Sequence, residues 1–197
     1  AHQWNAWLHL VRERFDDMVA ELDTAQSLDP LSLVINDHLG YGLFLAGREP
    51  EAMEQLRRTQ ELDPNYPLTY WRLGAIHLQQ GLAEQAIGEL QRTVDLTEGQ
   101  LGLGYLALAC ARAGQGQVAR SALLRLEALA EARYISPLER ALAHAGLREA
   151  DAAFQWLERA FEDRTSDLVR IKWLPWPESL RLDPRFADLV RRIGLAP

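Results

Sequence analysis

The chain has 197 residues, of which 48% are hydrophobic and 25% are charged, as is usual for a folded globular protein. Its formal net charge of −7 argues against nucleic acid as the main partner, because that binding depends on lysine and arginine side chains that neutralise phosphates. No apolar run approaches the roughly 18 residues that a membrane-spanning helix needs. Neither nucleic acid nor a membrane is therefore an expected partner.

The single cysteine, Cys110, leaves no internal disulfide to form and favours a reducing compartment, so we expect a cytoplasmic protein. An exported domain without disulfides is the open alternative. The amino terminus, "AHQWNAWLHL", lacks the basic start and apolar centre of a signal peptide. The first residue is not a methionine, which suggests a piece of a longer protein.

Two consecutive segments of 34 residues resemble each other without a gap. They are "LVINDHLGYGLFLAGREPEAMEQLRRTQELDPNY" (33–66) and "PLTYWRLGAIHLQQGLAEQAIGELQRTVDLTEGQ" (67–100). The matching positions are Leu39 with Leu73, Gly40 with Gly74, Gly47 with Gly81, Ala52 with Ala86, Leu56 with Leu90, and Leu62 with Leu96. The chain is therefore built, at least in part, from an internal repeat.

Each copy predicts a helical hairpin. In the second copy the first helix begins at Pro67 and ends at Gly81, because proline suits a first turn and glycine suits a left-handed exit. In the first copy the second helix begins near Pro50 and stops at Asp63, since Pro64 disfavours helical geometry in the residue before it. The small residues that match between copies fall where the two helices of a hairpin approach closely.

Weaker copies continue the pattern in both directions. Leu28-Asp29-Pro30 lies one period before the same tripeptide at 62–64, which makes 1–32 a first copy. The segment 101–133 fits if one residue is dropped, with Gly114 at the turn and Ala119 at the small position. The segment 134–166 forms a fifth copy, in which Arg148 replaces the turn glycine. Residues 167–197 remain as a carboxy-terminal capping segment.

The Leu-Gly, Gly, Ala and Leu-Asp-Pro spacings resemble the tetratricopeptide repeat (TPR), a 34-residue family of antiparallel helix pairs. The resemblance covers about residues 1–166. It implies an all-α fold, namely a right-handed superhelical solenoid of about five repeats whose first helices line the concave side, closed by a terminal helix.

The resemblance also implies which side chains face a ligand. These are Trp7, Val34, Asp37, Tyr41, Phe44, Leu45, Leu68, Trp71, Leu78, Gln79 and Arg112. Such a groove is apolar and aromatic, and it suits an apolar peptide or helix with Tyr41 and Trp71 as anchors. A chaperone-type carboxylate clamp is not expected, because Asp37 would repel a carboxylate and only Arg112 would attract one. Alternatively, these residues pack against neighbouring helices or are covered by a segment of the same chain.

No pattern in the chain indicates catalysis, a metal or a cofactor. His9, His77 and His144 occupy the same position of the first, third and fifth copies, and a rise on the order of 10 Å per copy prevents them from sharing a zinc ion. Cys110 lies at that position of the fourth copy and reads as a buried thiol. The glycines follow the hairpin turns and not a nucleotide-binding spacing. We therefore expect a protein without enzymatic activity.

The tail combines prolines, tryptophans and basic residues. Thr165 or Ser166 can cap a short helix that Pro175 and Pro177 end, and Asp183 followed by proline starts another. The last helix carries an apolar stripe of Phe186, Leu189, Val190 and Ile193 and ends at Gly194. Trp173 and Trp176 either close the fifth hairpin or, with the surrounding arginines, bind an acidic partner.

The ending "RLDPRFADLVRRIGL" is similar to the end of TPR regions in bacterial signalling proteins, where such repeats follow an effector domain. This resemblance implies a fragment of a larger bacterial regulator. The expected function is a protein-protein interaction scaffold that binds an apolar peptide or helix. The alternative is a self-association arm, forming a homodimer and restraining an attached effector domain.

Overall fold

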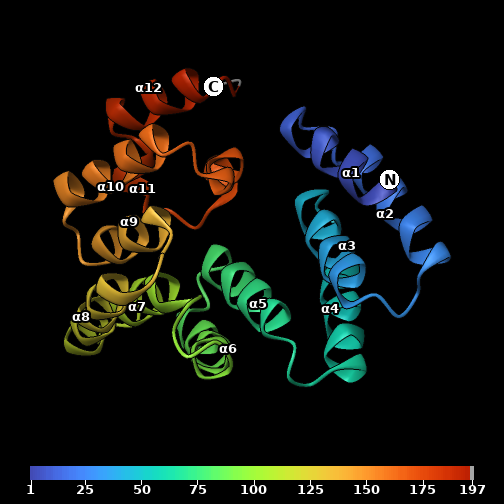
Figure 1. The fold of residues 1–197 in the computed structure, drawn as a ribbon, viewed down its shortest axis with the longest axis horizontal. Coiled ribbons are helices and arrows are strands. Elements are labelled where there is room, and N and C mark those ends of the chain that lie inside the picture. The colour runs from blue at the N-terminus through green and yellow to red at the C-terminus, as the bar shows by residue number, and fades with distance from the viewer. Residues whose placement is uncertain (196–197) are drawn as a thin grey trace. The chain divides into compact units, whose positions relative to one another are not determined.

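The computed structural model describes residues 1–195, and over that range the chain is all helical, without a β-strand (Figure 1). The α-helices are α1 His2–Val11, α2 Phe15–Leu28, α3 Leu33–Leu45, α4 Glu49–Leu62, α5 Pro67–Gln79, α6 Ala83–Leu96, α7 Leu103–Arg112, α8 Gly116–Ala132, α9 Pro137–Gly146, α10 Ala150–Glu162, α11 Glu178–Arg181 and α12 Pro184–Ile193, and a 3-10 helix, η1, spans Ser166–Trp173. The all-α prediction is confirmed.

The chain divides into two compact units, and the boundary falls inside α5, between Leu73 and Gly74. We call residues 1–73 the N-terminal unit and the residues from Gly74 onward the C-terminal unit. In the N-terminal unit α1 packs on α2, α2 on α3 and α3 on α4. In the C-terminal unit α6 packs on α7, α7 on α8 and α9, and α9 on α10. Each unit is thus made of antiparallel helices with an apolar core of its own.

The turn inside each helical hairpin repeats one geometry. Glu13, Gly47, Gly81, Gly114 and Arg148 all adopt a left-handed conformation, with φ between 56° and 78°. In each turn the next residue donates its backbone N–H to the carbonyl five residues earlier, at 2.8 or 2.9 Å. The predicted turns at all three glycines are confirmed, and Glu13 and Arg148 hold the same left-handed position in the first and last hairpins.

Small residues lie where the two helices of a hairpin touch. A Cβ added to Gly40 would lie 2.7 Å from the side chain of Leu56, and one added to Gly74 would lie 2.5 Å from that of Leu90. Ala52 is fully buried. Because these leucines fill the space above the glycines, larger residues would separate the helices, as the sequence predicted.

The tail folds onto the last hairpin. The expected short helix at 166–173 is a 3-10 helix, and the Thr165 side chain makes no capping hydrogen bond to it. Asp183 caps α12 by accepting from the backbone N–H of Arg185, as predicted. Phe186 and the two other leading residues of the apolar stripe are buried, and α12 packs on α10 and η1. The tail therefore covers the apolar flank of the last hairpin, which is the closing role expected of it.

Candidate functional site

Three predicted groove residues of the N-terminal unit are buried around one arginine. The Arg72 side chain donates from Nη2 and Nε to Oδ2 of Asp37, at 3.1 and 3.3 Å. Its guanidinium lies 4.2 Å from the ring centroid of Tyr41 and 4.8 Å from that of Trp71. All four side chains are buried, so in this structure Asp37, Tyr41 and Trp71 surround Arg72 and are not exposed to solvent.

The electrostatics of this cluster follow from its burial. Asp37 has no exposed surface, and Arg72 neutralises its charge at hydrogen-bonding distance. Burial, followed by the Asp37 carboxylate, raises the pKa of the Tyr66 phenol to about 12. The cluster is thus a paired charge wrapped by aromatic rings, which suits a structural role in joining α3 to the start of α5.

Other predicted residues of the N-terminal unit keep accessible apolar surface. We call these residues the apolar face: Trp7, Val34, Phe44, Leu45 and Leu68. Val34 is 39% exposed, and the others are half-buried. The Trp7 ring meets His38 edge-on, with centroids 4.8 Å apart, and Gln3 donates to the same imidazole at 3.0 Å. The Gln3 hydrogen bond thus orients the imidazole against which the Trp7 ring packs.

In the C-terminal unit the predicted ligand-facing positions hold a segment of the chain itself. Arg112 donates from Nη1 to the carbonyl oxygen of Leu78 at 2.7 Å and from Nη2 to that of Pro175 at 2.5 Å. The Gln79 side chain donates to the carbonyl oxygen of Trp173 at 2.8 Å. Leu78 is fully buried. We call residues 173–176 the strap, because they cross between α5 and α7 and are held there through their backbone carbonyls.

The strap is fixed at its other side by the tail. Trp176 is buried, and its indole N–H donates to the carbonyl oxygen of Ile171 at 2.8 Å. Its ring packs edge-on against Phe186 of α12, with centroids 6.3 Å apart. Arg181 donates to the carbonyl oxygen of Leu174 at 3.1 Å. Of the two alternatives for the tryptophans, these contacts of Trp176 correspond to closure of the last hairpin.

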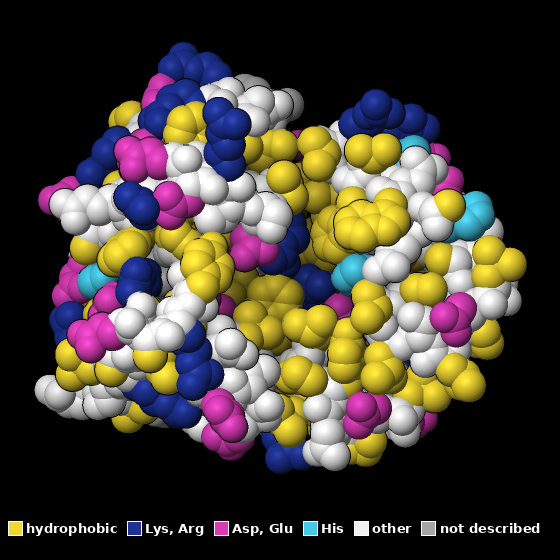
Figure 2. Space-filling view, viewed as in Figure 1, with side chains coloured by type: hydrophobic (Ala, Val, Ile, Leu, Met, Phe, Trp, Pro, Cys, Tyr) yellow, Lys and Arg dark blue, Asp and Glu magenta, His cyan; other side chains and the backbone are white. Residues whose placement is uncertain are grey.

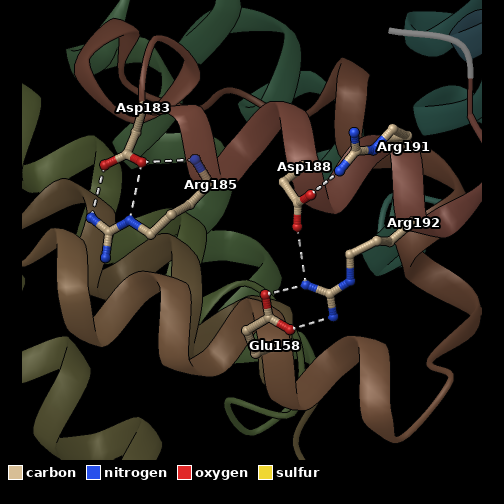
Figure 3. A network of polar contacts seen from close by, with 6 residues as sticks. All are labelled: Glu158, Asp183, Arg185, Asp188, Arg191 and Arg192. Carbon is tan, nitrogen blue, oxygen red and sulfur yellow. Dashed lines mark hydrogen bonds and ion pairs between the residues drawn. The ribbon is translucent and has the colours of Figure 1, made fainter.

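Several arginines of the tail are paired with carboxylates of the same chain (Figure 3). Arg192 of α12 binds both carboxylate oxygens of Glu158 on α10, at 2.8 and 2.7 Å, and also reaches Asp188 at 3.4 Å. Arg185 contacts both oxygens of Asp183, at 3.0 and 2.8 Å. Exposed pairs contribute little stability singly, but two of them join α12 to α10: Arg192 with Glu158, and Arg185 with Asp151 at 2.8 Å. These arginines are therefore occupied and not presented to an acidic partner.

One buried carboxyl group forms no ion pair with a cation among residues 1–195. Glu139 of α9 is buried and accepts backbone N–H bonds from Gly102 at 3.1 Å and Gly104 at 2.6 Å, at the start of α7. Burial raises its pKa to about 7, although the backbone N–H groups of Gly102, Gly104 and Tyr105 act in the opposite direction. The nearby Asp167 carboxylate raises the pKa further. The first turn of α7 is thus capped by a side chain from another helix.

The histidines and the cysteine considered in the sequence analysis can be placed in the structure. Within residues 1–195, no group of three or more His, Cys, Asp or Glu side chains is placed to hold a metal ion. Cys110 is 1% exposed, and burial raises the pKa of its thiol, which disfavours the reactive thiolate. His144 lies 2.7 Å from Glu149 in a pair that closes its own hairpin turn. The burial of Cys110 predicted from the sequence is confirmed.

None of the helices described in residues 1–195 combines the length and the apolar character that crossing a membrane requires. A comparison with models of known protein families finds no match for the chain, and a search of curated proteins finds no similar sequence.

Sequence reasoning left open that a segment of the same chain covers the groove, as the strap does in the C-terminal unit, but it identified neither the strap nor the role of Glu139. It placed Gln79 and Arg112 at ligand-facing positions without linking them to the strap, from which they are 94 and 63 residues distant in the chain. The one signal was Arg112 itself, a lone cation in an apolar groove. Glu139 gave no signal, because an acidic residue in a first helical turn is ordinary.

Proposed function

We propose that the chain is a TPR-type interaction scaffold without enzymatic activity, and that its apolar face binds an apolar peptide or helix. The proposal includes the right-handed solenoid expected of that family, a place in a larger bacterial regulator, and a cytoplasmic location. The repeated left-handed turns support the repeat assignment, because they recur at 34, 34, 33 and 34 residues along the chain.

One observation carries the proposal, namely the strap held by Gln79 and Arg112. It supports the proposal because two side chains expected to face a ligand hold another segment of the chain through its backbone carbonyls. Gln79 lies one period of 34 residues after Leu45, and Leu78 lies one period after Phe44. The equivalent positions of the N-terminal unit thus carry the apolar face.

The two surfaces differ in chemistry. The strap is bound through polar donors, whereas the apolar face offers Val34, Trp7 and three further apolar side chains. Burial of apolar surface contributes about 25 cal/mol per Å², and aromatic side chains are frequent anchors of such contacts. The apolar face therefore favours a segment with hydrophobic side chains over one recognised by charge.

A selection from a phage-displayed library of random ten-residue peptides, followed by titration of the enriched peptides, tests this assignment. We expect enrichment of aromatic and aliphatic sequences that lose binding to the Val34→Glu variant. Val118→Glu is the matched control, because Val118 is 50% exposed on α8 and lies outside the apolar face. Equal binding of the enriched peptides to both variants would remove the apolar face as the binding surface.

Self-association is the second candidate, and a separate surface favours it. Trp4, Leu8 and Val11 are 76%, 57% and 41% exposed and lie along one side of α1. In Figure 2 hydrophobic side chains are visible on the surface over this helix. Exposed apolar stripes of this kind commonly mark protein contacts.

Sedimentation analysis over a range of protein concentrations distinguishes the two candidates. Self-association through α1 predicts a dimer that the Leu8→Glu variant abolishes. Leu124→Glu serves as the control, since Leu124 is 64% exposed on α8 and outside the stripe. A chain that sediments as a monomer at every concentration contradicts this second candidate and leaves the peptide-binding proposal intact.

A further inference from the structure

The C-terminal unit contains a cavity that the strap does not fill. Its volume is about 700 Å³, and it lies between the end of α7, the turn from α9 to α10, and the segment that enters α11. This size is within the range of ordinary small-ligand sites. Its lining belongs entirely to the C-terminal unit, so it is separate from the apolar face.

The lining combines an apolar floor with cationic side chains. The apolar part comes from Leu108 and Ala111 of α7, Ala145 of α9 and Leu180 of α11. The cationic part comes from Arg112 and Arg148, and Ser179 adds a hydroxyl group. No aspartate or glutamate side chain lines the cavity among the described residues.

The arginines of this cavity are not neutralised within the chain. Arg112 donates to the carbonyls of Leu78 and Pro175, and in residues 1–195 neither it nor Arg148 forms an ion pair with a carboxylate. Arg181 lies near enough to lower the pKa of the Arg112 guanidinium, after the larger effect of burial. Arg112 and Arg181 thus repel each other, and such like charges leave a positive potential at the cavity.

The nearest acidic neighbour of Arg148 along the chain is already engaged. Glu149 contacts Arg120 at 2.6 Å and His144 at 2.7 Å, and neither of these residues lines the cavity. Arg148 is exposed and points from a turn whose left-handed position is glycine in three of the other four hairpins. An arginine there costs conformational free energy that glycine would not, and it adds a second cation to the cavity.

We propose that this cavity binds a carboxylate carried beside an apolar side chain, as found in a short acidic peptide. The guanidinium of Arg148, with the remaining N–H groups of Arg112, would bind the carboxylate through charge-assisted hydrogen bonds. The apolar floor formed by Leu108 and its neighbours takes the adjacent hydrophobic side chain. The carboxylate can come from an acidic side chain or from the end of a chain.

Three capped dipeptides test the proposal against the full chain by 1H–15N NMR titration. Acetyl-leucyl-leucine carries a terminal carboxylate, acetyl-glutamyl-leucine amide carries a side-chain carboxylate, and acetyl-leucyl-leucine amide carries neither. We expect at least one acid to shift the amide resonances of Gly146, Arg148 and Ala150, which lie around the cavity. The acid that binds more tightly identifies the source of the carboxylate. Equal shifts from the uncharged dipeptide, or none from either acid, overturn the proposal.

The variant Arg148→Gly, which should keep the fold, provides a second test of the carboxylate site. Arg148→Gly removes the cation and supplies the residue that the equivalent turns use, so we expect an intact hairpin and binding weaker by about tenfold. Glu13→Gly makes the corresponding change in the first hairpin and should leave the affinity unaltered. Wild-type affinity in Arg148→Gly would contradict the assigned role of that arginine and with it the site. Raising the salt concentration should weaken acid binding in the wild type.

Discussion

Glu139 caps a helix to which it does not belong: its carboxylate accepts the backbone N–H of Gly104 at 2.6 Å and forms no ion pair within residues 1–195. Between α7 and α9 the backbones approach so closely that a Cβ added to Gly104 would lie 1.9 Å from the carbonyl oxygen of Glu139. The same pair of residues therefore combines a steric contact with a buried, titratable hydrogen bond. Both properties lead to measurable consequences for the C-terminal unit.

The stability of the C-terminal unit should depend on pH through Glu139. Its pKa is about 7 in the folded chain and 4.5 in the unfolded reference, so between these values the folded state keeps a proton that the unfolded state has lost. The free energy of unfolding therefore falls as pH rises through this window, by on the order of 3 kcal/mol. Urea unfolding at several pH values measures the slope. Glu139→Gln cannot ionise and should flatten it, whereas an unchanged slope in that variant would assign the dependence to other groups.

Gly104→Ala should be strongly destabilising, because the added methyl group meets backbone atoms that cannot rotate away. We expect a loss of about 3 kcal/mol or more in the free energy of unfolding. Gly88→Ala is the matched control within the same unit, since nothing lies within 4 Å of its added Cβ. In an exposed helix interior that change should stabilise by roughly 0.5–1 kcal/mol. Thermal unfolding of both variants and the wild type measures these changes, and we expect a lower melting temperature for Gly104→Ala and a higher one for Gly88→Ala.

Removing one member of the Asp37–Arg72 pair should lower the free energy of unfolding much more than replacing both members with apolar residues. Arg72→Met leaves the Asp37 carboxylate buried without a cation, which typically costs about 3–5 kcal/mol. In the double variant Asp37→Leu with Arg72→Met both charges are absent, and most of that stability should return. Hydrogen exchange localises the effect, and we expect faster exchange in residues 1–73 only for the single variant. A double variant as unstable as the single one would show that the pair contributes more than mutual neutralisation.

The repeat made much of the fold predictable, because hairpin turns and close contacts repeat with the sequence. Gly47, Gly81 and Gly114 were placed by spacing alone, and the cap at Asp183 by its dipeptide. The short helix predicted after Thr165 is present, but as a 3-10 helix. Periodicity describes each copy in isolation, however, and the remaining features join one copy to another.

The groove residues illustrate that limit. Position in the repeat marks Asp37 and Trp71 as ligand-facing, but it cannot show that Arg72, from the next copy, turns inward between them. Val34, at another ligand-facing position of the same copy as Asp37, is 39% exposed. Charge pairing between copies is set by side-chain packing in three dimensions, and no spacing rule in the sequence encodes it.

Release of the strap should be controlled by Arg112. Arg112→Ala leaves the carbonyl groups of Leu78 and Pro175 without their donor, and a hydrogen bond to a charged group contributes roughly 1.5–3 kcal/mol. Amide exchange in peptides covering the strap should therefore accelerate by about tenfold or more. Arg125→Ala, on α8, is the control and should leave that exchange unchanged.

Trp176 is also anchored by the carbonyl of Ile171 and by Phe186. We therefore expect the last hairpin to stay closed in Arg112→Ala, with the buried indole still protected from quenchers of fluorescence. Simultaneous exposure of Trp176 would instead mean that the strap and the closing tail detach as one element.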